Sequence, residues 1–484
     1  MWLQLVERET WRKSFSEWFH DVIFRAELLD YRYPIKGCGV WLPYGFKLRN
    51  KILSIIRRLL DETGHEEVLF PLLITESMLG KEAEHVESFS SQVFWVTRAG
   101  REELAEKLAL RPTSETAIAP MLKLWIRSHA NLPKRIYQIV STFRYETKAT
   151  RPLIRIREIT TFKEAHTCHE SFEEAEEQVR TAVKIYSKFF DELAVPYIIS
   201  KRPEWDKFAG ALYSLAYDTI FPDGRTLQIG TIHNLGQNFS KAFEIVFETR
   251  EGKHDYVWQT CYGISERVVA ATIAIHGDDH GLVLPPTVAP IQVVIIPIPY
   301  KGFEEAILSK VKSLAEGLKR EGFTVEVDLR EKYTPGSKFY EWELRGVPIR
   351  IEVGPRDVEN RTVTMVRRDS LERTVIPEDE VYQALPKLLS EIQEALRERA
   401  LKEFKEKIKR FTNLGEALTF IKNTGRLGII ELPWCEKNEC GIRMEEETGL
   451  KALGTPYPEE EAGNVRCAIC GGEAKSFLRL SRQY

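Results

Sequence analysis

The chain has 484 residues, of which 43% are hydrophobic and 29% are charged, and its formal net charge is −3. A chain of this length is too long for a single hydrophobic core, so we expect two to four domains. A net charge so close to zero excludes a globally basic protein, so any nucleic-acid partner must meet a local basic surface. The mixed charges of residues 1–18 exclude a signal peptide, and the apolar runs are too short for a membrane span. We expect a cytoplasmic protein with no membrane partner.

The N-terminal part of the chain predicts two helices followed by a strand. Residues 10–29 and 46–63 each place apolar side chains at helical spacing, and Gly64 ends the second helix. Residues 67–73 have the pattern of a strand that ends near Pro71.

The middle of the chain predicts an antiparallel sheet. Strand patterns occur at residues 135–144, 153–162, 227–232, 242–248 and 257–264. Helices are expected at residues 172–193 and 266–275. Strands in series with few helices between them favour antiparallel pairing, so the expected fold class is α+β.

The pattern changes at Pro285-Pro286. Strands and helices then alternate, at residues 291–298, 303–321, 324–328, 338–345, 349–353, 363–367 and 381–404. This alternation predicts a small α/β domain with parallel strand pairs. We therefore divide the chain into an α+β region at 1–285, an α/β domain at 286–400 and a C-terminal domain at 401–484.

Four of the seven cysteines lie in two close pairs near the C-terminus, Cys435 with Cys440 and Cys467 with Cys470. Seven cysteines in so long a chain do not form a disulfide scaffold and indicate a reducing compartment. Four thiolates suit a closed tetrahedral Zn²⁺ site, which leaves no open position for catalysis. We predict a structural zinc site; unliganded buried thiols or a redox pair are the alternatives.

Arg144 and Glu146 are the first pair with a possible role in catalysis. Two residues apart on a strand, they present a guanidinium and a carboxylate on one face. A guanidinium matches two phosphate oxygens, and a carboxylate accepts from the amino group of adenine. Arg155 and Arg157 are expected on the neighbouring strand. Taken alone, the pattern is equally typical of surface ion pairs.

The sequence Phe143-Arg144-Tyr145-Glu146, followed by a short loop and an arginine, resembles motif 2 of the class II aminoacyl-tRNA synthetases. Residues 46–71 resemble their dimer-forming motif 1, and Gly263-Ile264-Ser265-Glu266-Arg267 resembles motif 3. The resemblance implies a homodimeric enzyme that uses ATP and Mg²⁺ to activate an amino acid, with Arg144 and Arg267 as catalytic residues. The ATP-binding residues that it implies are Arg144, Glu146, Arg155, Ile156, Gln228, Thr231, Ser265 and Arg267.

Longer strings resemble the prolyl-tRNA synthetases of the archaeal and eukaryotic type, over nearly the whole chain. They are residues 110–116 (Leu-Arg-Pro-Thr-Ser-Glu-Thr), 162–167, 230–236 and 276–279 (His-Gly-Asp-Asp). This resemblance implies L-proline and tRNA(Pro) as substrates. A hydroxyl and a carboxylate suit the two N–H donors of proline, and Phe89 is expected to help wall its ring. The implied proline-binding residues are Thr113, Glu115, Arg144, Phe162, His166 and His233.

The α/β domain resembles the anticodon-binding domain of this class, and residues 338–350 mix aromatic and basic side chains. Guanine offers acceptors to Arg350 and donors to Glu343, so we expect these residues to read the anticodon. A solvated helix face is an equal alternative for either residue. Relatives of this type also end in tyrosine, so the carboxylate of Tyr484 is expected near the active site.

The segment between motif 2 and motif 3 leaves no room for the editing insertion of bacterial-type relatives. A pocket that recognises shape rejects a slightly smaller side chain by only about 1–3 kcal/mol, so we expect misactivation of cysteine or alanine. The alternatives are a synthetase for threonine, glycine or histidine, a non-catalytic tRNA-binding relative, and a zinc-dependent RNA-binding regulator. Thr113 and Glu115 disfavour the first, Arg144, Glu146 and Arg267 disfavour the second, and the third rests on the cysteine pairs alone.

Overall fold

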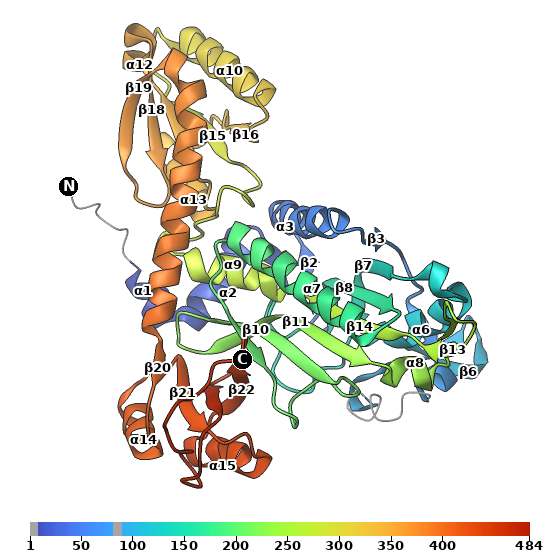
Figure 1. Ribbon diagram of the computed structural model, residues 1–484. Helices are drawn as coiled ribbons and strands as arrows, with labels where there is room; N and C mark the ends of the chain where they lie inside the picture. Colours follow the sequence, from blue (N-terminus) through green and yellow to red (C-terminus); the bar gives the residue numbers. More distant parts are fainter. Residues whose placement is uncertain (1–7, 81–89) are drawn as a thin grey trace.

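The computed structural model describes residues 8–80 and 90–484. The chain forms three lobes, and one long helix, α13 (Val381–Glu406), runs between the upper and the lower left lobe (Figure 1). The third and largest lobe holds most of the central sheet. Phe89 falls outside the described residues.

The central sheet has eleven strands in the order β20-β21-β23-β22-β9-β10-β11-β14-β8-β7-β3. In this order they are β20 (Ile408–Arg410), β21 (Ile429–Trp434), β23 (Ser476–Ser481), β22 (Lys451–Pro456), β9 (Ile198–Lys201), β10 (Tyr213–Ile220), β11 (Thr226–Gly236), β14 (Trp258–Ile264), β8 (Glu158–His169), β7 (Lys134–Phe143) and β3 (Glu66–Glu67). Neighbouring strands are antiparallel except at the two ends of the sheet, where β20–β21 and β3–β7 are parallel. The predicted α+β core with an antiparallel sheet is confirmed.

One face of the sheet is covered by α3 (Pro43–Asp61), α7 (Phe172–Glu192) and α9 (Arg267–His276). Ile232, Tyr262 and Ala165 lie in register across β11, β14 and β8 and are fully buried in the same core. Side chains alternate along a strand, so their chain neighbours on these strands point to the opposite face. That opposite face carries the cavity described below.

The helix predicted at residues 10–29 is instead two helices, α1 (Glu9–Lys13) and α2 (Phe15–Arg25), because the backbone leaves helical geometry at Ser14. The buried Trp11 fastens this segment to the core, since its indole N–H donates to the Ala274 carbonyl at 2.9 Å. Its backbone N–H donates to the Asp279 carboxylate at 2.9 Å. The second predicted helix, at 46–63, is confirmed as α3.

Three strand predictions are wrong in extent. Residues 67–73 are not one strand, because Pro71 lacks the N–H that a ladder needs; only β3 and β4 (Leu73–Thr75) pair there. The strand predicted at 153–162 begins at Glu158 as β8, since Leu153 takes a positive φ of 59° in a turn. Residues 242–248 contain the end of α8 (Asn238–Ala242) and then β12 (Val246–Glu248), which pairs with β13 (His254–Tyr256).

The upper lobe is the α/β unit expected after residue 285. Its sheet has the order β16 (Val325–Val327), β15 (Val293–Pro297), β17 (Ile349–Val353), β18 (Thr362–Arg367) and β19 (Arg373–Pro377). The first two pairs are parallel, as predicted, and the last two are antiparallel. Helices α10 (Glu304–Arg320), α11 (Pro335–Leu344) and α12 (Pro355–Asn360) accompany it.

The C-terminal lobe contains α14 (Leu414–Asn423), α15 (Asn438–Thr448) and the last strands of the chain. Strand β22 pairs with β9, so this lobe extends the central sheet. The boundary predicted between residues 400 and 401 falls inside α13, which enters the lobe as a continuous helix.

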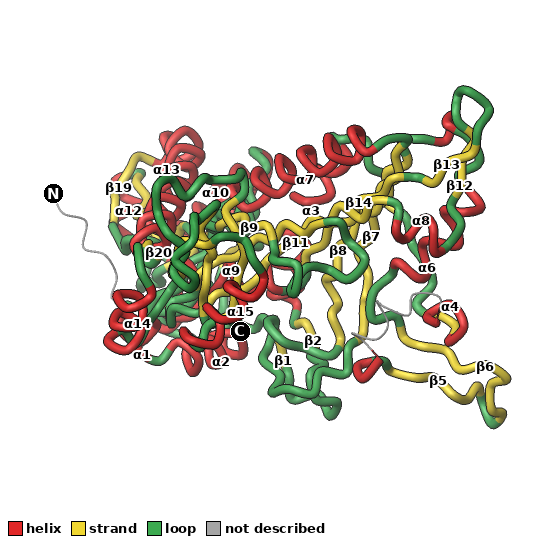
Figure 2. Tube along the Cα trace, turned by 60° about the horizontal axis from the view of Figure 1, so that its bottom comes forward, coloured by secondary structure: helices red, strands yellow, loops and turns green. Residues whose placement is uncertain are grey.

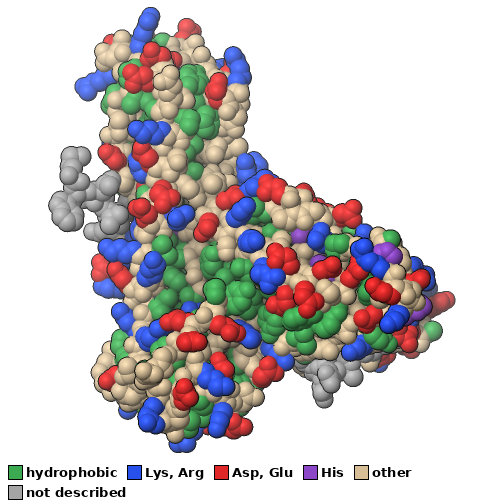
Figure 3. All heavy atoms as spheres, viewed as in Figure 1, with side chains coloured by type: hydrophobic (Ala, Val, Ile, Leu, Met, Phe, Trp, Pro, Cys, Tyr) green, Lys and Arg blue, Asp and Glu red, His purple; other side chains and the backbone are tan. Residues whose placement is uncertain are grey.

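The outer surface mixes both signs of charge. On the face in Figure 3, lysine and arginine side chains are interspersed with aspartate and glutamate side chains, in keeping with the net charge of −3. A hairpin of β5 (Phe94–Ala99) and β6 (Glu102–Leu110) projects beyond the central sheet (Figure 2). Among the described residues, no helix has both the length and the apolar character required to cross a membrane.

A buried ion pair fixes the upper lobe to the largest one. Both terminal nitrogens of Arg368 donate to the Asp278 carboxylate at 2.6 Å, and both side chains are 2% exposed. The Nε atom of Arg368 donates to the carbonyl of Glu343 at 2.8 Å. The aspartates of the string at 276–279 therefore act as structural anchors, Asp278 toward the upper lobe and Asp279 toward the N-terminus.

Replacing Arg368 by alanine should destabilise this junction by about 3–5 kcal/mol, because it leaves the Asp278 carboxylate buried and unpaired. Urea unfolding followed by circular dichroism measures the loss. The matched control is Arg356→Ala, which removes an exposed arginine of α12 and should change the midpoint little. Equal midpoints for the two variants would contradict an anchoring role.

Candidate functional site

The site is built on neighbouring strands of the central sheet. The pairing of β11, β14 and β8 sets two adjacent rows of residues side by side, His233-Cys261-His166 and Thr231-Gly263-Glu164. Residues two apart on a strand share a face, so both rows point away from the helix-covered core. The sheet therefore offers one continuous polar floor.

A cavity of about 330 Å³ lies over this floor. Its walls bring together all but one of the described residues that were predicted to bind proline or ATP. The predicted residues that line it are Thr113, Glu115, Arg144, Glu146, Arg155, Ile156, Phe162, Gln228, Thr231, His233, Ser265 and Arg267. The exception is His166, which lies just behind the wall.

Arg144 and Arg267 line the same cavity. Arg144 follows the last residue of β7, not on the strand as predicted, and its Nε donates to the carbonyl of Pro112 at 3.0 Å. The Nε of Arg267, the first residue of α9, donates to the carbonyl of Ile154 at 3.1 Å. Burial lowers the pKa of both groups, and the nearby Arg144 and Arg155 help to bring the pKa of Arg267 to about 10. Two clustered cations fit a polyphosphate.

Arg155 and Arg157 are both candidates for the arginine that follows the motif 2 loop, with Arg155 favoured, and their side chains point in different directions. Neither lies on the neighbouring strand, because β8 begins only at Glu158. Arg155 lines the cavity, with its Nε 3.9 Å from a Glu146 carboxylate oxygen. Arg157 instead donates to the backbone carbonyl of Glu146 and lies over the Tyr145 ring, 4.0 Å from its centroid. Arg155 is thus the one in reach of a nucleotide.

Thr113 and Glu115 lie deep in the other part of the cavity. Glu115 is the first residue of α6 (Glu115–Trp125), and its carboxylate accepts a hydrogen bond from the Thr113 hydroxyl. The Glu115 side chain also lies 3.6 Å from the Cys261 sulfur. Phe162 lies beside this pair, with the Arg144 guanidinium 5.9 Å from its ring centroid. The Glu115 carboxylate, which can accept from an ammonium group, therefore lies beside the apolar ring of Phe162 and near the guanidinium of Arg144.

His166 and His233 are held differently. The Nδ1 atom of His233 lies 2.8 Å from the Ser214 hydroxyl, and its ring stacks on Phe208 with centroids 4.6 Å apart. The Nε2 atom of His166 lies 3.3 Å from the Glu164 carboxylate. Burial alone would lower the pKa of His166, but Cys261 and the neighbouring carboxylates raise it well above its ordinary value. His233 is a wall residue, and His166 positions the wall.

The wall also contains residues that were not among those predicted, including Glu164, Phe208, Ser214 and Cys261. Glu164 lies inside the string at 162–167, so that string contained a signal for it. Phe208 lies in the loop before β10, and Ser214 lies near the start of that strand. Neither residue belongs to a recognised motif. Cys261 lies outside the recognised strings, and only the strand register reveals that it lies between His233 and His166.

The predicted anticodon pair lies in the upper lobe, and its two members bind each other. Arg350 donates to the Glu343 carboxylate at 2.6 Å and to Glu352 at 3.0 Å. Its guanidinium also lies over the Phe339 ring, 4.3 Å from the centroid. Contact with a base by either residue requires a rearrangement of this ion pair. Tyr340, which lies on α11 together with Glu343, is half exposed.

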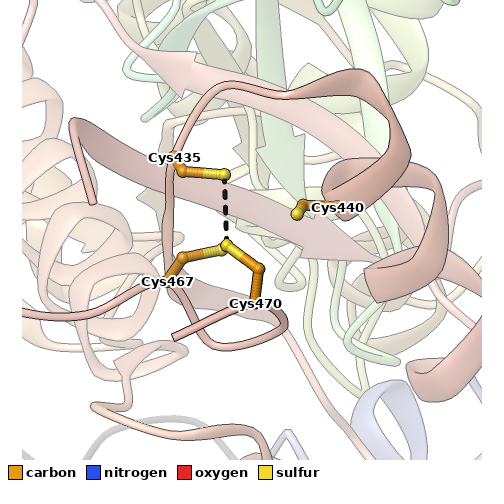
Figure 4. Close-up of side chains that lie close together, drawn as sticks. All are labelled: Cys435, Cys440, Cys467 and Cys470. Carbon is orange, nitrogen blue, oxygen red and sulfur yellow. Dashed lines mark hydrogen bonds between the residues drawn. The ribbon is translucent and has the colours of Figure 1, made fainter. Parts of the chain in front are cut away.

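The four predicted zinc ligands converge in the C-terminal lobe (Figure 4). One sulfur from each of Cys435, Cys440, Cys467 and Cys470 lies within 4.8 Å of the others. The sulfurs of Cys435 and Cys470 are 3.8 Å apart. This equals the edge of a tetrahedron with Zn–S bonds of about 2.3 Å, which is about 3.8 Å. The residues present therefore fit Zn²⁺.

Tyr484 is anchored at the turn between β10 and β11. Its hydroxyl donates to the Asp223 carboxylate at 2.6 Å, and its ring packs on Phe221. The Arg151 guanidinium, from the loop after motif 2, lies 5.2 Å from the centroid of the same ring. The end of the chain thus contacts the motif 2 loop.

Comparison with known proteins agrees with this arrangement. Three family models match the chain: "tRNA synthetase class II core domain (G, H, P, S and T)" over residues 94–276, "Anticodon binding domain" over 292–388 and "Prolyl-tRNA synthetase, C-terminal" over 416–484.

Individual relatives match over nearly the full length. The proline–tRNA ligase of Methanopyrus kandleri is 57% identical over 98% of this chain and 96% of its own, and that of Aeropyrum pernix is 55% identical over 99% of each. The solved structure of the Giardia lamblia prolyl-tRNA synthetase in complex with prolyl-adenylate matches 100% of both chains, with a TM-score of 0.94 and 37% identity. The chain therefore belongs to the proline–tRNA ligases of the class II aminoacyl-tRNA synthetases.

Proposed function

We propose that the chain activates L-proline with ATP to prolyl-adenylate and transfers the prolyl group to tRNA(Pro). The observation that carries this proposal is that one cavity holds both the Thr113–Glu115 pair and the arginines Arg144 and Arg267. Family membership supports the reaction, and the cavity supports the roles of individual residues.

In the proposed complex the secondary ammonium of proline donates to Thr113 and Glu115. The pyrrolidine ring lies between Phe162 and His233, and Phe208 backs the histidine. His166 holds the floor behind them through Glu164. The carboxylate of proline then faces Arg144, which points toward the triphosphate.

The first step needs no side-chain nucleophile. An oxygen of the proline carboxylate attacks the α-phosphorus of ATP, and the bond from that phosphorus to the pyrophosphate oxygen breaks. Arg144 balances charge at the carboxylate and the α-phosphate, and Arg267 balances it on the departing pyrophosphate. Glu146, Arg155, Ile156, Gln228, Thr231 and Ser265 position the nucleotide. In the second step the terminal ribose hydroxyl of the tRNA attacks the activated carbonyl carbon and AMP leaves.

The cavity also offers an oxygen that fits Mg²⁺. Glu266 lines it and is buried; one carboxylate oxygen accepts from Thr160 and Thr161, and the other has no hydrogen-bond partner among the described residues. Mg²⁺ prefers carboxylate oxygens and phosphates, so Glu266 is the residue that would hold it. When bound, the ion neutralises charge on the phosphates.

The remaining assignments concern assembly and stability. We assign Zn²⁺ to the four C-terminal cysteines, as a structural ion with no open position. Exposed Leu69, Leu72 and Leu73 beside Pro71 support a homodimer through motif 1, because large apolar side chains gathered on a surface mark interfaces. Reduced cysteines support a cytoplasmic location.

We keep residues 1–285, 286–400 and 401–484 as catalytic, anticodon-binding and zinc-binding domains. Glu343 and Arg350 are assigned to anticodon reading, with the opening of their ion pair as a condition.

Replacing Arg144 by alanine should lower proline-dependent ATP–pyrophosphate exchange by 100-fold or more, as removal of one preorganised donor costs about 10²–10³ in rate. The control is Arg157→Ala, whose guanidinium turns away from the cavity. Arg157→Ala should lose far less activity, with both melting temperatures near that of the parent chain. Near-normal exchange by Arg144→Ala would remove Arg144 from the reaction.

Cysteine and alanine should both support exchange, at a kcat/KM lower than that for proline by about 10–200-fold. The reason is that a pocket walled by Phe162 and His233 can exclude larger side chains but not slightly smaller ones. Exchange measured with each purified amino acid tests this expectation. No detectable exchange with either would show that the pocket discriminates by more than shape.

The chain purified and dialysed without added metal should contain one zinc ion, and a strong chelator should unfold the C-terminal lobe. Metal analysis and limited proteolysis measure the two effects. Cys470→Ser should lose the ion and become protease-sensitive, because three thiolates no longer close the site. Cys38→Ser, which alters a cysteine far from the cluster in sequence, should keep both the ion and the protection.

A further inference from the structure

A second cluster of metal-ligand side chains lies in the floor of the proline pocket. One ligand atom each from Glu115, His166 and Cys261 lies within 4.8 Å of the others. The three residues come from the start of α6, from β8 and from β14. They are 6%, 4% and 5% exposed, so the cluster is more than nine-tenths buried. The reaction assigned above gives Cys261 no task.

We propose that Glu115, His166 and Cys261 bind a soft divalent cation such as Zn²⁺, and that this ion excludes proline from its pocket. The site would be inhibitory and separate from the four-cysteine site. This proposal rests on the proposed function in one respect, because it assumes that the ammonium of proline binds at Glu115.

The distances fit a tetrahedral ion. The Cys261 sulfur lies 3.8 Å from Nε2 of His166 and 3.6 Å from a carboxylate oxygen of Glu115. With Zn–S of about 2.3 Å and Zn–N or Zn–O of about 2.0–2.1 Å, the edges of a tetrahedron are about 3.5–3.6 Å. The observed separations exceed these edges only slightly. Small side-chain movements would therefore close the three ligands on one ion.

The charges also fit. A carboxylate and a thiolate balance the two charges of the cation, and imidazole is a common third ligand. Thr113 donates to one carboxylate oxygen of Glu115, and the other oxygen faces Cys261. The Nε2 atom of His166 that faces Cys261 also lies 3.3 Å from the Glu164 carboxylate, so the ion would take the place of that contact. Thr113 orients Glu115, as a supporting contact does at a metal site.

Three protein ligands leave the fourth tetrahedral position open. Glu115 and Cys261 both line the cavity, so the ion would occupy the space that the proline ammonium needs. Binding of the cation and binding of proline are then mutually exclusive. The expected signature is competition with proline, not with ATP.

Zinc binding to the dialysed full-length chain tests the proposal directly. After the first ion, added ZnCl₂ should fill one further equivalent per chain, and saturating proline should prevent its uptake. In ATP–pyrophosphate exchange, the same zinc concentrations should raise the KM for proline severalfold and leave kcat unchanged. Co²⁺ gives an independent readout, because a Co²⁺–thiolate bond absorbs in the near ultraviolet.

Two variants remove ligands independently, Cys261→Ser and His166→Gln, and each is compared with its own rate in zinc-free buffer that contains Mg²⁺. Both should lose the second equivalent, while Cys38→Ser should retain it. A chain that binds only one zinc ion, or a second ion that survives Cys261→Ser or ignores proline, would overturn the proposal. Absence of proline-dependent exchange in zinc-free buffer that contains Mg²⁺ would instead count against the proposed function, and the zinc count would still test the site.

Discussion

The pairing register of β11, β14 and β8 is the constraint on which the site depends. It places Ile232 and Tyr262 against the helices while His233 and Cys261 face the cavity. Side chains alternate with a period of two, so a slip of one residue would bury the polar row and expose the apolar one. The hydrophobic contacts beneath α7 therefore hold the catalytic face in register. Stability and activity depend on the same pairing.

The fold also holds two cationic side chains in place before any substrate binds. Arg144 and Arg267 are directed into one cavity by hydrogen bonds to backbone carbonyls, those of Pro112 and Ile154. Burial and repulsion from Arg144 and Arg155 lower the pKa of Arg267, because a buried cation beside other cations is unfavourable. A polyphosphate relieves that repulsion when it binds. Charge held in place before the reaction needs no reorganisation during it.

Local sequence patterns predicted the elements whose periodicity is set by burial, including α3, α7 and β17. They failed where backbone geometry decides, as at the positive φ of Leu153, which delays β8 to Glu158. The resemblance supplied the residues of the recognised motifs, and the structure brings most of them to one cavity. Phe208 was missed because stacking on His233 depends on a loop that carries no motif. The position of Cys261 beside His166 and His233 follows from the pairing register of β14 with β8 and β11. The residue pattern of a single strand does not determine that register.

The pocket that accepts proline is also chemically open to a metal. Recognition of a secondary ammonium needs a buried carboxylate, and Glu115 in that position attracts any small cation. The neighbouring thiol and imidazole decide which cation binds more tightly. Mg²⁺ prefers oxygen ligands, whereas Zn²⁺ is bound well by sulfur and nitrogen. We therefore assign the Mg²⁺ that accompanies ATP to the oxygen of Glu266 and not to the proline floor. One cavity can thus keep a hard ion at its phosphate end while a soft ion competes at its amino-acid end.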